Sequence, residues 1–230
     1  EALIYSDTSS QHTCNYCGFE FTSTIYCPKG HFVCDSCHAA DAIDLLLIMT
    51  GSETSTNPLE IVEAAFRHHS FKFHGPEHHS LVPAALLISM KNRRLSKPNG
   101  DEITSETIKE GIRRGSRIPG GFCGTAGNCG ACVGAGIAVA LFLGSTPKKG
   151  SERKAAHEAT IAALELVTDG LIRCCKRSTL YGITAAVRVL RNNYGVDLGP
   201  EPALGSCENA ERNPDCAKEE CLFYVSNAVT

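Results

Sequence analysis

Two cysteine pairs with the same internal spacing constrain this chain more than any other feature. Cys14 and Cys17 form one CxxC pair, Cys34 and Cys37 form the other, and sixteen residues separate the pairs. A CxxC knuckle presents two thiolates to one face, and two knuckles at this spacing complete the tetrahedron that Zn²⁺ prefers. We therefore predict a closed structural zinc site in a zinc-ribbon-like β module over residues 1–40.

Cys27 and His31 lie between the two pairs and are additional candidate ligands. With the four paired cysteines they match the opening ligands of a cross-brace, RING-like pattern, but the later CxxC of that pattern is missing. We interpret His31 as an ordinary loop residue. For Cys27 the choice between spare ligand and loop residue stays open.

The number and context of the cysteines favour metal binding over disulfides. Thirteen of the 230 residues are cysteines, the count is odd, and two of them are adjacent. The first residues lack the charged and apolar regions of an export signal, so we expect a cytoplasmic, reducing environment. Clustered cysteines in such an environment typically bind metal or carry out chemistry.

Composition argues against two classes of partner. The net charge is −3 and the aromatic content is 7%, which fits neither a basic groove nor a base-stacking platform for nucleic acid. The longest small or apolar run, residues 131–143, is shorter than the roughly 18 residues of a membrane span. We expect neither a nucleic-acid nor a membrane partner, and the oligomeric state is left open.

The rest of the chain, residues 41–230, predicts a mainly α fold. Asn57, Pro58 and Glu60 provide a cap, a first-turn proline and an early acidic residue for one helix. Further helices are expected over 81–90, 103–114, 129–143, 151–167 and 178–193. Gly130, Gly134 and Ala138 form a small-residue stripe that allows another backbone to approach closely. Strand patterns are confined to residues 19–26 and, more weakly, 222–226.

A histidine-rich segment precedes the helix predicted at residue 81. His74, His78 and His79 occur with Glu77 in six positions, and Gly75-Pro76 predicts a turn that aims their side chains. Imidazoles beside a carboxylate can bind a metal or act as a general base, so these four residues are the candidate catalytic groups. The alternative is a loop that caps the following helix. The chain has no HExxH motif, which excludes a zinc protease of that type.

The remaining cysteines are candidate ligands of an iron–sulfur cluster. Cys129 ends a glycine-rich loop at a helix start, where the helix dipole favours a thiolate. The density of thiols favours a [4Fe–4S] cluster over a second zinc or inert thiols, although the spacings match no common cluster motif. Cys132 is interpreted as a small core residue. The candidate cluster ligands are Cys123, Cys129, Cys174, Cys175, Cys207, Cys216 and Cys221.

Most of the chain resembles an uncharacterised domain family of anaerobic bacteria and archaea. The resemblance rests on the two knuckles, on HGPEHHSLVPAALL, IPGGFCGTAGNCGACVGAGIA, LGSTPKKG and RCCKRST, and on the final cysteines ending in CLFY. Members of that family are sometimes joined to SAM-dependent methyltransferases. The resemblance implies an anaerobic context and a methyltransferase as a candidate partner, but no reaction.

A second, partial resemblance is to the α chain of iron–sulfur L-serine dehydratases. GFCGTAGNCGACVGAGIAVALFLGSTP is similar to that family's glycine/cysteine segment, CCKRSTLYGITAAVRVL to its later cysteine–helix segment, and GPEHHSLVPAALL to its substrate-side loop and helix. In that family three cysteines hold a [4Fe–4S] cluster whose open iron acts as a Lewis acid on the substrate hydroxyl. The resemblance implies Cys123 as the first ligand and Cys174 or Cys175 as the last.

The chain departs from the dehydratase pattern at two points. The stretch that matches the middle ligand, near Ala162 and Ala163, has no cysteine, and the serine-binding glycine signature is absent. The cluster would then be completed by Cys129 or by the cysteines after residue 200. Serine itself is not the expected substrate.

Three functions follow as hypotheses. The first is a cluster-dependent lyase or sulfur-handling enzyme, in which an open iron polarises a hydroxyl or binds a thiol and His78 or His79 moves the proton. Its partner is a small-molecule substrate or a sulfur species. The second is a non-catalytic iron–sulfur protein that delivers electrons, sulfur or a cluster to an enzyme such as a methyltransferase. The third is a zinc-stabilised helical domain with buried thiols only.

Overall fold

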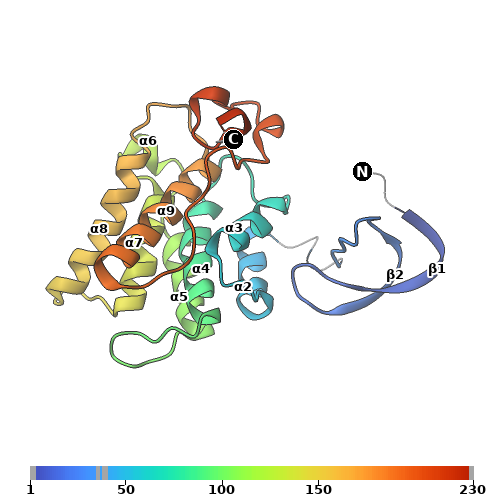
Figure 1. Ribbon diagram of the computed structural model, residues 1–230, viewed down its shortest axis with the longest axis horizontal. Coiled ribbons are helices and arrows are strands. Elements are labelled where there is room, and N and C mark those ends of the chain that lie inside the picture. Colours follow the sequence, from blue (N-terminus) through green and yellow to red (C-terminus); the bar gives the residue numbers. More distant parts are fainter. Residues whose placement is uncertain (1–3, 35–36, 38–40, 228–230) are drawn as a thin grey trace.

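The computed structural model describes residues 4–34, 37 and 41–227, and shows a mainly helical chain with a small sheet at its N-terminal end. The helices form one body, and the two strands project to one side of it (Figure 1). The predicted fold class is confirmed. Part of the predicted N-terminal module, including His38, lies outside the described residues. The elements are β1 (Ile4–Thr13), β2 (Glu20–Tyr26), α2 (Ala42–Ser52), α3 (Pro58–Arg67), α4 (Glu77–Asn92), α5 (Ser105–Ser116), α6 (Phe122–Thr125), α7 (Gly130–Leu143), α8 (Gly150–Leu166), α9 (Cys175–Tyr194) and the short 3₁₀ turns η1 (Ala210–Arg212), η2 (Lys218–Glu220) and η3 (Val225–Asn227).

The predicted helices are present, but α4 and α9 begin several residues earlier than their patterns suggest, α9 at Cys175 and not at Ser178. α3 begins as expected, with the Oδ1 atom of Asn57 accepting a hydrogen bond from the backbone N–H of Leu59 at 3.0 Å. α4 begins at Glu77 and not at Leu81, so Pro83 lies inside the helix. The helix continues through Pro83, although the proline has no N–H to bond to the carbonyl of His79 four residues earlier.

Three elements escaped the sequence analysis, and one expected strand is absent. α2 is apolar with little periodicity, α6 spans one turn, and β1 is a polar strand without alternation. Strand β1 pairs antiparallel with β2 only, so neither of its faces needs to be apolar. The expected strand at 222–226 is wrong: those residues form turns and part of η3, and the described residues contain no strand there.

The core forms around α4, which packs against α5, α7 and α9, while α8 packs against α7 and α9. The small-residue stripe of α7 makes these contacts close, as expected. A Cβ atom added at Gly134 would lie 3.0 Å from the carbonyl oxygen of His79 on α4, and one at Gly136 would lie 2.7 Å from the carbonyl of Ala156 on α8. None of the described helices is long and apolar enough to cross a membrane.

Candidate metal centres and reaction cavity

The four cysteines of the two CxxC pairs converge on one point beside the sheet. Their sulfur atoms, from Cys14, Cys17, Cys34 and Cys37, all lie within 4.8 Å of one another, so this N-terminal tetrad could bind a metal ion. Each sulfur pair in a tetrahedral zinc–thiolate site is about 3.8 Å apart, because each Zn–S bond is about 2.3 Å long. The spacing of the tetrad is compatible with that geometry.

Backbone hydrogen bonds in the tetrad favour the thiolate form of Cys14, which is the form that binds a metal ion. The N–H of Cys34 donates to the sulfur of Cys14 at 3.4 Å. Burial opposes ionisation of Cys14, but backbone N–H groups of this kind lower its pKa to about 7. Burial raises the pKa of Cys37. Cys27 and His31 are not part of the group, although the N–H of Cys27 donates to the carbonyl of His31 at 3.4 Å.

The tetrad is attached to the helical body through residues that gave no sequence signal. Nε2 of the buried His68 donates to the carbonyl of Cys37 at 2.8 Å. The ring of Tyr16, inside the first knuckle, meets the ring of His68 edge-on at 5.1 Å. The Tyr16 hydroxyl donates to the carbonyl of Ala64 on α3 at 3.4 Å. The side chain of Tyr16, inside the first CxxC pair, thus attaches that pair to α3 and His68.

A cavity of about 650 Å³ lies where α4, α7 and α9 all begin, and we name it the reaction cavity. Its walls come from the histidine segment, from the glycine-rich loop before α7 and from the segment between α8 and α9. The structure therefore brings together three regions that the sequence analysis singled out separately. The predicted site residues that line it are His74, His78, His79, Cys123, Cys129, Cys174 and Cys175.

Cys129 is the residue whose surroundings most favour a thiolate. It is the N-cap of α7, and the Cys132 thiol, the backbone N–H groups of Ala131 and Cys132 and the Ser178 hydroxyl lie near its sulfur. The Cys132 thiol above all, with those backbone groups, lowers the pKa of Cys129 to about 5. The same contact with Cys129, together with burial, raises the pKa of Cys132. Cys132 is fully buried, as predicted.

His79 has a fixed orientation and one nitrogen available to the reaction cavity. Nδ1 of His79 donates to the backbone carbonyl of Ile118 at 3.1 Å, so we assign the proton to Nδ1 and leave Nε2 as an acceptor. No other described residue hydrogen-bonds Nε2. The ring lies directly on the start of α7: a Cβ atom added at Gly130 would be 2.4 to 2.6 Å from ring atoms of His79. Glycine at this position permits the contact.

His78, by contrast, is occupied at both nitrogens. Nε2 donates to the carbonyl of Lys72 at 2.8 Å, and Nδ1 accepts from the hydroxyl of Thr179 on α9 at 2.9 Å. Burial lowers the pKa of His78 to about 3, so it is neutral at physiological pH. Although it contributes to the cavity wall, its geometry is that of a tie between the histidine segment and α9.

Glu77 and His74 have different positions again. Glu77 accepts from the backbone N–H of Lys72 at 3.1 Å and folds back over Gly75, so it stabilises the loop. Nε2 of His74 lies 3.1 Å from a carboxylate oxygen of Asp215, while its Nδ1 is buried and has no partner among the described residues. A group bound in the cavity would supply that partner.

The adjacent residues Cys174 and Cys175 serve two different cavities. Cys175 lines the reaction cavity and not the second one, and the backbone N–H of Gly75 lies near its sulfur; burial raises its pKa to about 11. Cys174 also lines a second, smaller cavity of about 60 Å³, between the start of α9 and the segment after residue 200. Arg177 lies in the wall that the two cavities share.

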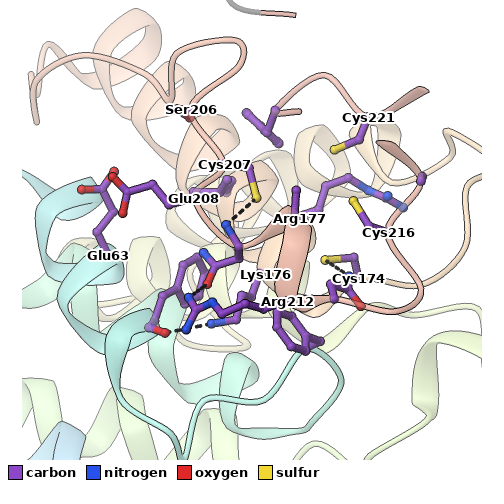
Figure 2. Close-up of a pocket in the computed structure, with 18 of the residues that line it drawn as sticks. Glu63, Cys174, Lys176, Arg177, Ser206, Cys207, Glu208, Arg212, Cys216 and Cys221 are labelled. Atoms are coloured by element: carbon purple, nitrogen blue, oxygen red, sulfur yellow. Dashed lines mark hydrogen bonds between the residues drawn. The ribbon is translucent and has the colours of Figure 1, made fainter. Parts of the chain in front are cut away.

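The second cavity gathers four of the predicted ligands, which we name the C-terminal four-cysteine site. It consists of Cys174, Cys207, Cys216 and Cys221. Their sulfur atoms surround a common space, and the basic side chains of Lys176, Arg177 and Arg212 lie close by (Figure 2). Within the described chain, no group of three ligands besides the N-terminal tetrad lies within 4.8 Å, so the sulfurs of this site are more widely spaced. The seven predicted cluster ligands thus divide between two places.

Residues 47–224 match the model of one protein family, DUF5714, which is described as a family of unknown function. The chain belongs to DUF5714. The matched region contains both cavities and excludes the N-terminal tetrad. No curated protein and no solved structure matches the chain. The DUF5714 region therefore has to be interpreted from its own geometry.

Proposed function

We propose that this DUF5714 chain is an iron–sulfur lyase that binds a [4Fe–4S] cluster through Cys123, Cys129 and Cys175 and acts on a small substrate in the reaction cavity. The observation that carries the proposal is the cavity itself. It combines three cysteines from two distant segments with a histidine, His79, whose tautomer is fixed and whose second nitrogen is available.

The residues of the cavity fit such a cluster. Backbone N–H groups lie near the sulfurs of Cys129 and Cys175, and such groups tune clusters in proteins when they hydrogen-bond the sulfurs. The orphaned Nδ1 atom of His74 indicates a missing polar partner in the same cavity. With three protein thiolates, one iron of a bound cluster would stay open and act as a Lewis acid toward a hydroxyl or thiol. The cavity of about 650 Å³ leaves room for a small molecule.

His79 is the residue we assign as the base. Its Nδ1–H is held by the carbonyl of Ile118, so Nε2 can take a proton from a substrate carbon while the ring keeps its orientation. The hydroxide or thiolate group on the neighbouring carbon then leaves on the cysteine side of the cavity. His78 is assigned a positioning role, because both of its nitrogens are already hydrogen-bonded.

Arg173 points to the substrate class. It lines the cavity, is exposed, and forms no ion pair with any described residue. A guanidinium without a carboxylate partner fits a substrate that brings its own carboxylate. We propose that the substrate is a small carboxylic acid that carries a hydroxyl or thiol group on carbon. It is not serine, and it undergoes β-elimination.

The test compares two neighbouring histidines. The chain is purified and reconstituted anaerobically, and a panel of 2- and 3-hydroxy and thiol acids is assayed for unsaturated acid product by ultraviolet absorbance. We expect His79→Gln to lose about 100-fold in rate, the effect of removing a general base, with an unchanged cluster spectrum. His78→Gln is the control and should retain most activity. Equal rates for His79→Gln and the parent chain would remove the assignment of the base.

For the N-terminal tetrad we propose a structural zinc ion. Four thiolates within 4.8 Å of one another match mononuclear coordination and leave no open position for a substrate. Inductively coupled plasma mass spectrometry on protein purified without added metal tests this, and iron in place of zinc would contradict it. A methyltransferase partner stays a prediction from the sequence.

A further inference from the structure

We propose that the C-terminal four-cysteine site is a second metal centre, separate from the reaction cavity, and that it binds a fully ligated [4Fe–4S] cluster. Its ligands are Cys174, Cys207, Cys216 and Cys221, one from the start of α9 and three from the segment after residue 200. In the proposed function the reaction cavity uses the three other cysteines, so the two sets share no ligand.

The first argument is convergence. The segment from residue 196 to 227 has only short 3₁₀ turns, yet it brings three cysteines to one cavity beside α9. Its own backbone bonds hold this arrangement: the N–H of Cys207 donates to the carbonyl of Phe223 at 2.8 Å, and the N–H of Gly205 donates to that of Leu222 at 3.1 Å. A segment with so little regular structure needs cross-links, and a shared metal centre provides four.

The second argument is the spacing of the sulfur atoms. The four cysteines line a cavity of about 60 Å³, and no three of their sulfurs lie within 4.8 Å of one another, as those of the N-terminal tetrad do. In a [4Fe–4S] site, iron and sulfide atoms stand between the thiolates, so the thiolate sulfurs are farther apart than around one zinc ion. The wider spacing therefore fits a cluster better than a single ion.

The third argument is the set of hydrogen bonds to the sulfurs. The N–H of Asn209 donates to Cys207 and the N–H of Lys218 donates to Cys216, each at 3.4 Å. Nδ2 of Asn213, a side chain that is 7% exposed, lies 3.9 Å from the sulfur of Cys174. Lys218 adopts a left-handed backbone conformation (φ 49°), which is costly for a residue other than glycine. In this conformation its N–H reaches Cys216.

The fourth argument is charge. A [4Fe–4S] cluster with four thiolates carries net negative charge, and the walls of this site hold more cationic than acidic side chains: Arg67, Lys176, Arg177 and Arg212 against Glu63 and Glu208. Lys176 and Arg177 are both buried and line the cavity, and Arg212 lines it as well. Nζ of Lys176 donates to the carbonyl of Phe66 at 3.0 Å, which holds the ammonium in place. Arg177 is paired with Asp169, with 3.1 Å between Nε and Oδ2. Buried charges need partners, and a cluster would be one for Lys176.

A cluster with four protein ligands has no open iron, so its chemistry is one-electron exchange. Because Cys174 and Cys175 are consecutive, this centre and the cluster of the proposed function would be neighbours. The electron-relay role rests on the proposed function, whereas the metal site itself does not.

Iron counting with matched variants tests the inference. The full chain is reconstituted anaerobically with iron and sulfide, and iron is counted in the parent chain, in Cys207→Ala and Cys216→Ala, and in Cys123→Ala and Cys129→Ala. We expect about eight irons per parent chain, corresponding to two clusters, and about four in each variant. The EPR spectrum of the reduced parent should also show interaction between two neighbouring spins, which every single variant loses.

The variants assign the iron to its place. If Cys207→Ala and Cys216→Ala keep the full iron content, or if the parent binds zinc at this site, the second centre is wrong. If all iron is lost in any one variant that retains its helical circular dichroism, the seven cysteines form one centre and the inference is equally wrong. Iron that responds to Cys207→Ala but not to Cys129→Ala supports the second centre and removes the cluster of the proposed function. The parent's spectrum decides between one and two clusters even if a variant fails to fold.

Discussion

The N-terminal tetrad and the C-terminal four-cysteine site have the same number of thiols but are built in opposite ways. The tetrad takes all its ligands from 24 consecutive residues (14–37) in two CxxC knuckles, and its sulfurs lie within 4.8 Å of one another. The C-terminal site takes its ligands from a helix start and from a loosely structured segment, around a cavity of about 60 Å³. Local spacing therefore fixes the first site, and tertiary packing fixes the second.

The difference underlies the metal that we propose for each site. The four sulfurs of the two knuckles lie within 4.8 Å of one another, which is the spacing of a mononuclear site and the reason why we propose a single zinc ion there. Sulfurs that come from separate elements are placed by the packing of those elements, which can leave room for a polynuclear cluster. The predictions below test whether the two sites really are independent.

The largest expected effect is the loss of the N-terminal ion. Cys37→Ala should remove zinc from the chain, since a structural zinc site contributes on the order of 10 kcal/mol to the folded state of its module. Zinc per chain is measured by mass spectrometry, and protease sensitivity of residues 4–34 is followed in parallel. Cys27→Ala is the matched control, because Cys27 lies outside the tetrad, and it should retain zinc.

The same variant also tests independence. The helical circular dichroism and the iron content of the Cys37→Ala chain should stay at the parent's level, because both cavities are formed by residues 63–223. Loss of iron together with zinc would show that the two regions are coupled, and the comparison drawn above would then fail.

Acid is expected to lower the unfolding free energy of the helical body, because His78 is buried there as a neutral side chain. The tetrad contains no histidine. Burial lowers the pKa of His78 from 6.5 to about 3, so the unfolded chain binds a proton in this range and the folded chain does not. The contribution of neutral His78 is therefore complete above pH 6.5 and is lost as the pH falls toward 3. At 1.36 kcal/mol per pH unit the loss is on the order of 5 kcal/mol.

His78→Gln is the matched variant for this measurement. Glutamine keeps a donor and an acceptor but does not titrate in this range. Urea unfolding between pH 7 and pH 4 should show a flatter pH dependence for His78→Gln than for the parent chain. Parallel curves for the two proteins would mean that His78 is not the residue responsible.

Features that depend on spacing along the sequence could be predicted, whereas features that depend on tertiary packing could not. The tetrad and the cap at Asn57 depend on spacing and on neighbouring residues, and both were predicted. The distribution of seven cysteines over two cavities was not, because only the packing of α9 brings Cys174, and not the adjacent Cys175, to the second cavity as well. The different positions of His78 and His79 depend in the same way on Thr179 and Ile118, far away in the chain.

A smaller effect is expected from a methyl group added between His79 and α7. Gly130→Ala would place a Cβ atom 2.4 to 2.6 Å from the imidazole ring, so the ring or the helix must move. Such overpacking costs about 1 to 3 kcal/mol. Chemical denaturation measures the loss, and Gly150→Ala is the control because nothing lies within 4 Å of its added Cβ atom. Zinc content should be unchanged, since the tetrad has no part in this contact.

The smallest effect concerns how each site forms the tight turn beside its cysteines. The first knuckle of the tetrad uses glycine, Gly18, at a left-handed position (φ 73°), whereas the C-terminal site uses Lys218 (φ 49°). Lys218→Gly keeps the N–H that reaches Cys216 and relieves about 1 kcal/mol of strain, of which about 0.5 kcal/mol is offset by the greater entropy of unfolded glycine. The melting temperature should rise by about 1 to 2 °C with unchanged iron content. Arg94→Gly (φ 56°), at the end of α4 and away from both sites, should give a similar gain. A loss of iron in Lys218→Gly alone would show that the lysine side chain, and not its backbone N–H, supports the C-terminal site.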